Sequence, residues 1–412
     1  MKNNNFIDLF AGCGGLSLGL KKAGWTGVFA IEKSPDAFKT LKHNLIDKDV
    51  VSSFQWPKWL PCQSMTTSDL IDGYSKQLKK LRGKVDLIAG GPPCQGFSFA
   101  GRRDPNDPRN RLTEEYIKIV ELVQPKFLLL ENVKGFNAAF KQVGKEKSKV
   151  YAKVVKEKLE NLGYTVFHKM CNASTFGVPQ PRARFIMMAF KKELELTHSP
   201  FDLLEQLLPE YRISKGLHET QNTSVKEAIS DFELKGAEII SSPDTKGFKQ
   251  VKYQNGKLTA YQKLMRKECD INDKPNSLRL ARHKETTLQR FELVLKNFPK
   301  GKSLTKQELL DLGTKKQCFT PLHPDMLSRT ITTLPDDLLH YSEPRILTVR
   351  ENARIQSFPD WFEFQGKYTT GGARRKEECP RYSQVGNAVP PLMAEAFGLV
   401  ITKMGQNKCL KK

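Results

Sequence analysis

The chain of 412 residues exceeds the usual size of one compact domain, so we expect two domains or one large domain with an insertion. Its 67 lysines and arginines against 45 aspartates and glutamates give a formal net charge of +22, which indicates a polyanionic partner. No run approaches the roughly 18 apolar residues of a membrane span, and no apolar signal-peptide core follows Met1, so we expect a cytoplasmic protein with no membrane partner.

The first half of the chain alternates short apolar runs with amphipathic segments, which predicts an α/β fold of the Rossmann type with a parallel sheet. Gly24 and Gly163 follow two of the predicted helices and would end them. The predicted strands cover residues 6–10, 28–31, 85–89, 127–130, 164–170 and 185–190. The predicted helices between them cover residues 16–23, 35–44, 114–123 and 149–162.

The region 197–343 is charged and rich in turns, and its clear amphipathic stretches lie at 288–295 and 306–312. Apolar periodicity returns at 350–358, and 392–401 reads as a closing helix that could pack on the sheet. We therefore divide the chain into a first domain at 1–196, a smaller inserted domain at 197–343, and a segment at 344–412 that returns to the first domain.

The first predicted strand runs into a glycine turn, Phe10-Ala-Gly-Cys-Gly-Gly15, that opens a helix. Glycines let the backbone approach a ligand, and a helix start offers N–H groups to a negative group, although a plain tight turn is an alternative. The spacing differs from the dinucleotide fingerprint, because Ser17 stands where a third glycine belongs. Glu32 ends the next strand, where it would accept hydrogen bonds from ribose hydroxyls or lie on the surface beside Lys33.

The segment Gly90-Gly-Pro-Pro-Cys-Gln-Gly-Phe-Ser-Phe-Ala-Gly101 follows the third predicted strand. Two prolines fix the backbone before Cys94, and the glycines after it allow a closing loop, so a thiol is presented for chemistry. The cysteines as a set show no zinc-ligand spacing, so we expect free thiols and no metal site. Basic residues that suit a loop closing over phosphates follow: Arg102, Arg103, Arg109 and Arg111.

The motif Glu131-Asn-Val133 ends the fourth predicted strand. A carboxyl at this place can donate a proton to a substrate, and the alternative is that Glu131 or Asn132 caps a helix. Gly12, Glu32, Cys94 and Glu131 thus all follow strand ends. Because ligands of open parallel sheets bind at the carboxyl ends of strands, we expect one rim to carry a pocket, a thiol and a carboxyl.

The motif Gln180-Pro-Arg-Ala-Arg-Phe185 enters the last predicted strand. Two arginines at i and i+2 of an extended chain point to one face, so we expect Arg182 and Arg184 to reach the same ligand. The alternative is a pair of edge charges that discourages aggregation.

Taken in order, these motifs resemble those of the cytosine-5 DNA methyltransferase family. Arg350-Glu-Asn-Ala-Arg-Ile-Gln356 and Gln384-Val-Gly-Asn-Ala-Val-Pro390 are similar to its two late motifs, and Thr330-Ile-Thr-Thr-Leu334 loosely matches an element that the family uses near DNA. The resemblance covers roughly two-thirds of the chain, and the order of the motifs is more specific than any one of them. It implies that 197–343 recognises the DNA target.

The resemblance also implies the reaction. Cys94 would add to carbon 6 of a flipped-out cytosine and activate carbon 5, Glu131 would act at ring N3, and Arg182 and Arg184 would hold the O2 side. S-adenosyl-L-methionine would be the cofactor, with Phe10 stacked on its adenine and Asn387 near its methionine part. The cofactor-binding residues implied are Phe10, Gly12, Gly14, Gly15, Glu32, Asp69, Pro92, Leu112, Asn387 and Ala388.

The partners implied are double-stranded DNA and a restriction endonuclease that acts separately on the same site, and we expect a monomer. A tRNA-methylating branch of the same family is the closest alternative, since Cys318-Phe-Thr320 matches a tripeptide of that branch. A nicotinamide- or flavin-dependent oxidoreductase would explain the glycine turn and Glu32 but not the other motifs. A DNA-binding protein without catalysis would have no need of Cys94 or Glu131.

Overall fold

The computed structural model describes residues 4–48, 50, 54–93, 111–137, 150–254, 256–270, 273–314, 316–370 and 378–406. The chain forms two compact units. The first contains Met1–Asn172, Ala183–Leu208 and Pro391–Lys412, and the second contains Ala173–Arg182 and Pro209–Pro390. Most of the region predicted to recognise the target lies in the second unit, together with residues 344–390, and its role in recognition stays a prediction.

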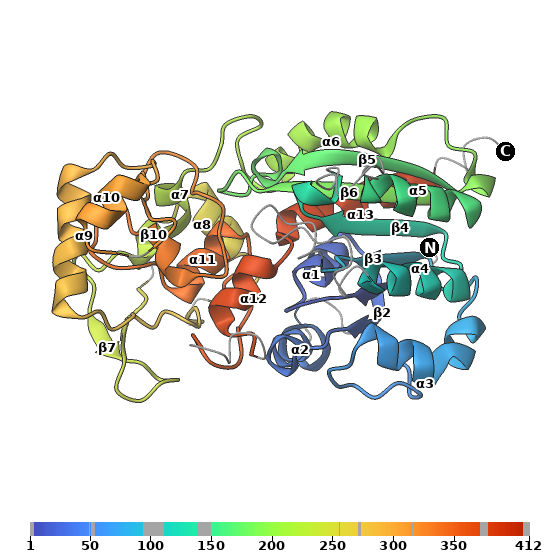
Figure 1. The fold of residues 1–412 in the computed structure, drawn as a ribbon, viewed down its shortest axis with the longest axis horizontal. Helices are drawn as coiled ribbons and strands as arrows, with labels where there is room; N and C mark the ends of the chain where they lie inside the picture. The colour runs from blue at the N-terminus through green and yellow to red at the C-terminus, as the bar shows by residue number, and fades with distance from the viewer. Residues whose placement is uncertain are drawn as a thin grey trace, which may run out of the picture. The chain divides into compact units, whose positions relative to one another are not determined.

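The first unit is built on a six-stranded sheet of order β2-β1-β3-β4-β6-β5 (Figure 1). All six strands that the sequence predicts are present, with end residues that differ slightly: β1 (Asn5–Leu9), β2 (Thr26–Ile31), β3 (Leu87–Gly90), β4 (Phe127–Asn132), β5 (Tyr164–Asn172) and β6 (Ala183–Lys191).

The prediction of a parallel sheet is wrong for β6. β1, β2, β3 and β4 pair in parallel, whereas β6 runs antiparallel to both of its neighbours, β4 and β5. The short connection between β5 and β6, Ala173–Arg182, explains the difference. A parallel crossover takes about a dozen or more residues and usually a helix, whereas antiparallel strands can be joined by a short segment.

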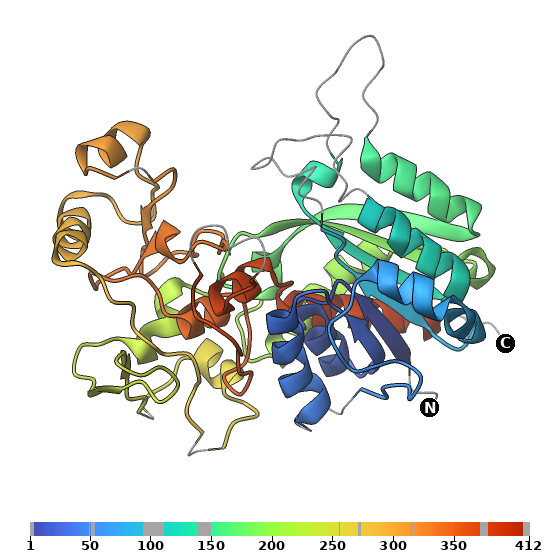
Figure 2. The same ribbon diagram turned by 60° about the horizontal axis from the view of Figure 1, so that its bottom comes forward.

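One face of this sheet carries α3 (Thr67–Lys80), α4 (Arg111–Val123) and α5 (Tyr151–Asn161), which lie side by side in Figure 2. Apolar side chains of these helices form one core with Ile7, Leu9 and other strand residues. Helix α3 is not among the helices that the sequence pattern predicts, because Gly73 interrupts it with a residue of low helix propensity. In the structure the helix is kinked at Tyr74, whose backbone angles are non-helical.

The other face of the sheet carries α1 (Gly15–Lys22), because strand residues alternate between faces and Asp8, between Ile7 and Leu9, contacts α1. α13 (Pro391–Gln406) packs against α1 so closely that a Cβ on Gly19 would lie 2.4 Å from the Cβ of Ala394. The stretch Arg381–Gln406 is, among the described residues, long and apolar enough to span a membrane, yet 72% of its apolar window is buried. That burial is typical of a core helix.

The remaining predicted helices are confirmed. α2 (Pro35–Lys42) continues into a short π-helical turn, η1 (His43–Asp47), and Gly24 and Gly163 both adopt φ 87° where helices end. α6 (Pro200–Ser214) runs from the first unit into the second and contains Pro209. Short 3₁₀ turns complete the chain: η3 (Lys134–Asn137), η4 (Ala173–Phe176), η5 (Lys192–Leu194), η6 (Ser230–Phe232) and η7 (Pro335–Asp337).

The second unit consists of short helices, irregular segments and two small two-stranded sheets. The amphipathic stretches predicted near 288–295 and 306–312 are α9 (Glu285–Asn297) and α10 (Lys306–Asp311), and Phe291 and Leu309 on them belong to one apolar core. The other helices and strands described in this unit are α7 (Val225–Ile229), β7 (Ile239–Ser241), β8 (Lys249–Val251), α8 (Ala260–Met265), β9 (Thr320–Pro321), β10 (Leu338–Leu339), α11 (Val349–Ile355) and α12 (Arg381–Asn387).

Candidate active site

The glycine turn after β1 has the backbone geometry that its sequence predicts. Gly12 and Gly14 adopt φ 58° and 97°, and Phe10 also lies in the left-handed region at φ 62°. A Cβ on Gly14 would lie 2.8 Å from Leu45, whereas a Cβ on Gly12 would meet nothing within 4 Å. Gly14 is therefore favoured by its φ of 97° and by the close approach of Leu45, while Gly12 borders open space into which a ligand can approach.

Glu32 holds this turn from the end of β2. Its Oε2 accepts a hydrogen bond from the Gly12 N–H at 2.9 Å, and its Oε1 accepts one from the Ser34 N–H at 2.7 Å. Burial raises the pKa of Glu32, and these two backbone donors oppose that rise. Each carboxylate oxygen has a second lone pair, so Glu32 can position the turn and still accept from a bound hydroxyl.

Asp8 is a buried carboxyl beneath the same turn that the motif analysis missed. The residue is fully buried, and its Oδ2 accepts a hydrogen bond from Ser17 Oγ of α1 at 2.5 Å. Burial raises the pKa of Asp8 to about 7, with Glu32 nearby adding to the rise. The signal in the sequence is an acidic residue in a strand whose other positions are apolar.

A second group of residues lies at the ends of β3 and β4. The Nε of Arg184 lies 2.7 Å from Oε1 of Glu131, and both side chains are nearly buried. A Cβ on Gly91 would lie 3.0 Å from Oε2 of Glu131, so the chain that leads to Cys94 passes beside this carboxyl. Asn132 Nδ2 donates to the carbonyl of Pro92 at 3.1 Å, which fixes that segment to β4.

Cys94 itself lies outside the described residues, as do Arg102, Arg103 and Arg109. The described residues reach Pro93, so the structure places the chain up to the residue before the predicted nucleophile. Beyond the gap, Arg111 is exposed at the start of α4 and Leu112 is half-buried.

The two arginines predicted to share a ligand have different partners. Arg182, 2% exposed, belongs to the second unit, where its Nη1 donates to the carbonyl of Ile331 at 2.9 Å and its Nη2 to that of Gly386 at 2.6 Å. Gln180 of the same motif also donates to a backbone carbonyl of the second unit, since its Nε2 lies 2.9 Å from the carbonyl oxygen of Ile355. The structure therefore brings Arg184 to Glu131, and the predicted role of Arg182 at a ligand stays a prediction.

The late-motif residues Asn387 and Ala388 also belong to the second unit. Asn387 is exposed at the end of α12, and the carbonyl of the buried Ala388 accepts a hydrogen bond from Gln356 Nε2. A Cβ on Gly386 would lie 2.3 Å from the carbonyl oxygen of Thr332, so the late motif packs directly on the Thr330–Leu334 segment.

Asp69 is exposed in the first turn of α3, where it forms a capping box with Thr66. Hydrogen bonds from the Thr66 hydroxyl and backbone lower the pKa of Asp69. This arrangement gives Asp69 a structural role at the helix start, and its predicted contact with an adenine stays a prediction.

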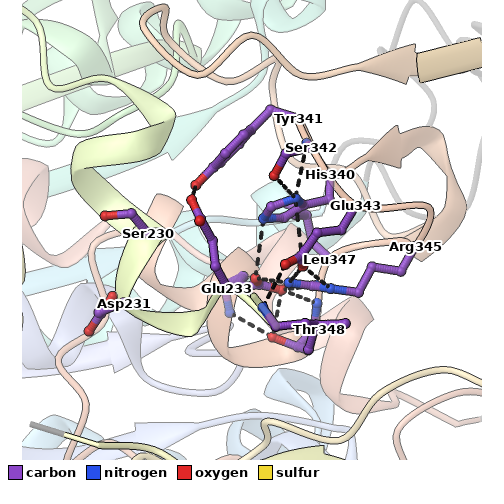
Figure 3. Close-up of polar contacts among 12 residues, drawn as sticks. Ser230, Asp231, Glu233, His340, Tyr341, Ser342, Glu343, Arg345, Leu347 and Thr348 are labelled. Atoms are coloured by element: carbon purple, nitrogen blue, oxygen red, sulfur yellow. Dashed lines mark hydrogen bonds and ion pairs between the residues drawn. The ribbon is translucent and has the colours of Figure 1, made fainter. Parts of the chain in front are cut away.

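A buried polar network, shown in Figure 3, fixes the start of α11 in the second unit. Arg345 donates to both carboxylate oxygens of Glu351 at 2.8 Å and contacts Glu343 at 2.7 Å. Although burial alone would raise it, the pKa of Glu351 is lowered by Arg345. The ring of His340 stacks on that of Tyr341, with 4.2 Å between the ring centres. Burial lowers the pKa of His340 to about 3, so its imidazole is neutral at pH 7.

Comparison with known proteins adds to this geometry. The family model described as C-5 cytosine-specific DNA methylase matches residues 4–403. The chain is 34% identical over 409 residues to the type II methyltransferase M.DdeI of Desulfomicrobium norvegicum. This alignment covers 95% of this chain and 87% of that protein. It is 32% identical to the type II methyltransferase M.XorII of Xanthomonas oryzae pv. oryzae, which covers 98% and 85%.

Solved structures share the fold at lower identity. An E. coli prophage protein described as a DNA modification methyltransferase superposes with a TM-score of 0.69 at 24% identity, and the match covers 100% of both chains. The Entamoeba histolytica methyltransferase EhMeth superposes with a TM-score of 0.54 at 15% identity, again over 100% of both chains. These likenesses support the Rossmann-like α/β architecture of the first unit.

Proposed function

The chain belongs to the C-5 cytosine-specific DNA methylase family and is a DNA (cytosine-5-)-methyltransferase, and from that premise we propose how its residues perform the reaction. The observation that carries the proposal is the pairing of Arg184 with Glu131 at 2.7 Å beside Gly91, three residues before Cys94. This places an oriented carboxyl next to the segment that ends in the proposed nucleophile.

S-adenosylmethionine, the proposed cofactor, supplies a methyl group activated by its sulfonium charge. The glycine turn suits it, because Gly12 borders open space and Phe10 offers a ring that is only partly buried. Glu32 keeps acceptor capacity for a ribose hydroxyl while its hydrogen bond to Gly12 holds the turn in place. The proposal keeps the other predicted cofactor-binding residues, which are Gly14, Gly15, Asp69, Pro92, Leu112, Asn387 and Ala388.

Cytosine carbon 5 is a weak nucleophile, so Cys94 first adds as a thiolate to carbon 6 and makes the ring electron-rich. Glu131 hydrogen-bonds ring N3 and accepts from the exocyclic amino group, and Arg184 holds that carboxyl in place. When bound, the cofactor would give its methyl group to carbon 5 and leave as the neutral thioether; after loss of the carbon-5 proton, the Cys94 sulfur would leave carbon 6 and restore the aromatic ring.

Arg184 is the arginine that we place beside Glu131 at the cytosine, and Arg182 keeps its predicted role on the O2 side of the ring. Through its two terminal nitrogens Arg182 also holds the Ile331 and Gly386 backbone together. A cytosine stacked in a duplex hides its ring face from a thiolate, so the target base is flipped out before reaction. The formal charge of +22 suits the duplex backbone.

The biological setting is proposed from the relatives, which are named type II methyltransferases. We place the enzyme in the cytoplasm as a monomer that protects DNA from a restriction endonuclease acting separately on the same sequence. Endonuclease challenge of genomic DNA from a strain that carries the intact or disrupted gene tests this setting.

Bisulfite sequencing of a plasmid from cells that express the protein tests the activity. Protected cytosines should occur in one short sequence, and they should disappear with Cys94→Ser, which lacks the proposed nucleophile. Full conversion of all cytosines despite folded, expressed protein would contradict the proposal. Methylated tRNA together with unmethylated plasmid would favour the tRNA-methylating alternative.

A further inference from the structure

Arg279, in the second unit, is packed against two aromatic rings. Its Cζ lies 4.1 Å from the ring centre of Phe248 and 3.8 Å from that of Tyr368. Its backbone is also fixed, because it pairs with Gln250 in an isolated bridge and the next residue, Leu280, donates to the carbonyl of Lys249 at 2.8 Å. The backbone of Arg279 is therefore fixed by hydrogen bonds, and its guanidinium is fixed by the two rings. The half-buried side chain has lost much of its rotational freedom.

The carboxylate of Asp244, which lies near Arg279, already accepts hydrogen bonds from other residues. Oδ2 of Asp244 accepts from Arg381 at 2.6 Å and from the Tyr368 hydroxyl at 2.8 Å, and Oδ1 accepts from Ser242 at 2.9 Å. Among the described residues, Arg279 has no hydrogen bond or ion pair from its guanidinium, and its Nε is buried without a partner.

The neighbouring arginines differ in this respect. Arg282 packs on the same Phe248 ring, with its Cζ 4.6 Å from the ring centre, but donates to the carbonyl of Gly247. Arg381 donates to Asp244 and to the carbonyl of Gly366. Leaving a half-buried cation with no acceptor is costly unless a ligand supplies one.

A planar guanidinium donates two parallel hydrogen bonds to two acceptors on one planar edge. In the major groove of DNA, O6 and N7 of guanine present this pattern, and Arg to guanine is the commonest specific base contact. A backbone phosphate is served as well by flexible surface lysines, so the aromatic packing that holds Arg279 in one orientation favours base recognition.

We propose that Arg279 is a specificity-determining residue whose terminal N–H groups donate to O6 and N7 of one guanine in the recognised DNA sequence. This inference rests on the proposed function, in which residues 197–343 recognise the target. It adds that one side chain of that region, Arg279, recognises a guanine.

The test uses the full-length enzyme and a set of duplexes that differ by single base pairs in and around the methylated sequence. The wild type should prefer guanine at one position, and Arg279→Gln should lower that preference by roughly 10- to 100-fold while other positions keep theirs. Arg282→Gln is the matched control and should leave the preference profile unchanged.

A second measurement changes the DNA, and its first readout uses the wild-type enzyme alone. Replacing each guanine of the preferred duplex in turn by 7-deazaguanine removes one acceptor, and the wild type should lose activity at one position. Arg279→Gln should be insensitive to the same replacement. The circular dichroism spectrum of Arg279→Gln should match that of the wild type, which checks that the variant is folded.

Wild-type enzyme that is insensitive to 7-deazaguanine at every position would overturn the inference. So would an Arg279→Gln enzyme that loses activity equally on all sequences and shows a weaker salt dependence, because that result identifies a phosphate contact. A wild type that methylates no duplex would instead overturn the proposed function, so the two failures are distinguishable.

Discussion

The Nε of Arg184 lies 2.7 Å from Oε1 of Glu131, and the two side chains are 13% and 14% exposed. The pair exists because β6 lies beside β4 in antiparallel register, with Phe185 opposite Asn132 and Ile186 opposite Glu131. The strand direction that the sequence pattern did not predict thus brings the guanidinium of one motif to the carboxyl of another. A carboxyl held in this way has a defined orientation toward a substrate.

Glu131→Gln should lower kcat by roughly 10²–10⁴-fold, because an amide cannot exchange a proton with ring N3 as a carboxyl can. The affinity for DNA and cofactor should change far less. Single-turnover kinetics with radiolabelled cofactor, together with filter binding, separate the two effects. Turnover within a few-fold of wild type would remove Glu131 from the chemistry.

Duplex DNA with 5-fluorocytosine at the target position should become covalently attached to Cys94 in a cofactor-dependent way. Methyl transfer leaves fluorine where a proton normally departs, so the thiol cannot be eliminated and the adduct accumulates. Denaturing electrophoresis detects the adduct, and peptide mapping locates the added mass. Cys94→Ser should form no adduct while still binding cofactor. An adduct on another residue, or none with an active enzyme, would contradict covalent catalysis by Cys94.

Asp8→Asn should remove a pH dependence of stability. Because the pKa of Asp8 is about 7 in the folded protein and 3.8 as an ordinary value, the unfolded chain loses this proton first as the pH rises. The contribution of protonated Asp8 to the free energy of unfolding is fully present below pH 4. It is lost as the pH rises from 4 to 7, and the total loss is roughly 4 kcal/mol. The ionisable groups facing Asp8 are Glu32 and Tyr116, and Ser17 donates its hydrogen bond.

Urea unfolding at pH 5 and pH 8 measures this effect. The free energy of unfolding of wild type relative to Asp8→Asn should be lower at pH 8 than at pH 5, since an amide keeps an acceptor for Ser17 but has no proton to lose. Asp8→Ala is the control that removes the acceptor as well, and it should be less stable than Asp8→Asn at both pH values. Parallel behaviour of wild type and Asp8→Asn would contradict the raised pKa.

Glu351→Gln should destabilise the protein by about 3 kcal/mol, because it removes one of the two carboxylate partners of a buried guanidinium and leaves only Glu343. Arg345 contacts Glu351 through two hydrogen bonds of 2.8 Å, and both side chains are buried. Glu157→Gln is the matched control, since Glu157 pairs with Lys153 at 4.0 Å on an exposed helix face and should cost less than about 1 kcal/mol. Urea unfolding measures both, and equal effects would show that the network in Figure 3 contributes little.

The amino-acid sequence by itself determined the six strands, most flanking helices, the glycine turn and the order of motifs that places the chain in its family. These features depend on local properties, since the alternation of apolar residues and the backbone freedom of Gly12 and Gly14 are written in neighbouring positions. The same holds for Gly24 and Gly163, which end helices with φ 87°.

Only the tertiary structure decided the direction of β6, the burial of Asp8 and the partners of the two arginines. Arg182 and Arg184 are two residues apart in one motif, yet the first donates to the backbone of Ile331 and the second pairs with Glu131. Which acceptor a guanidinium reaches depends on segments far away in the sequence that packing brings within 3 Å, and no local periodicity encodes that distance.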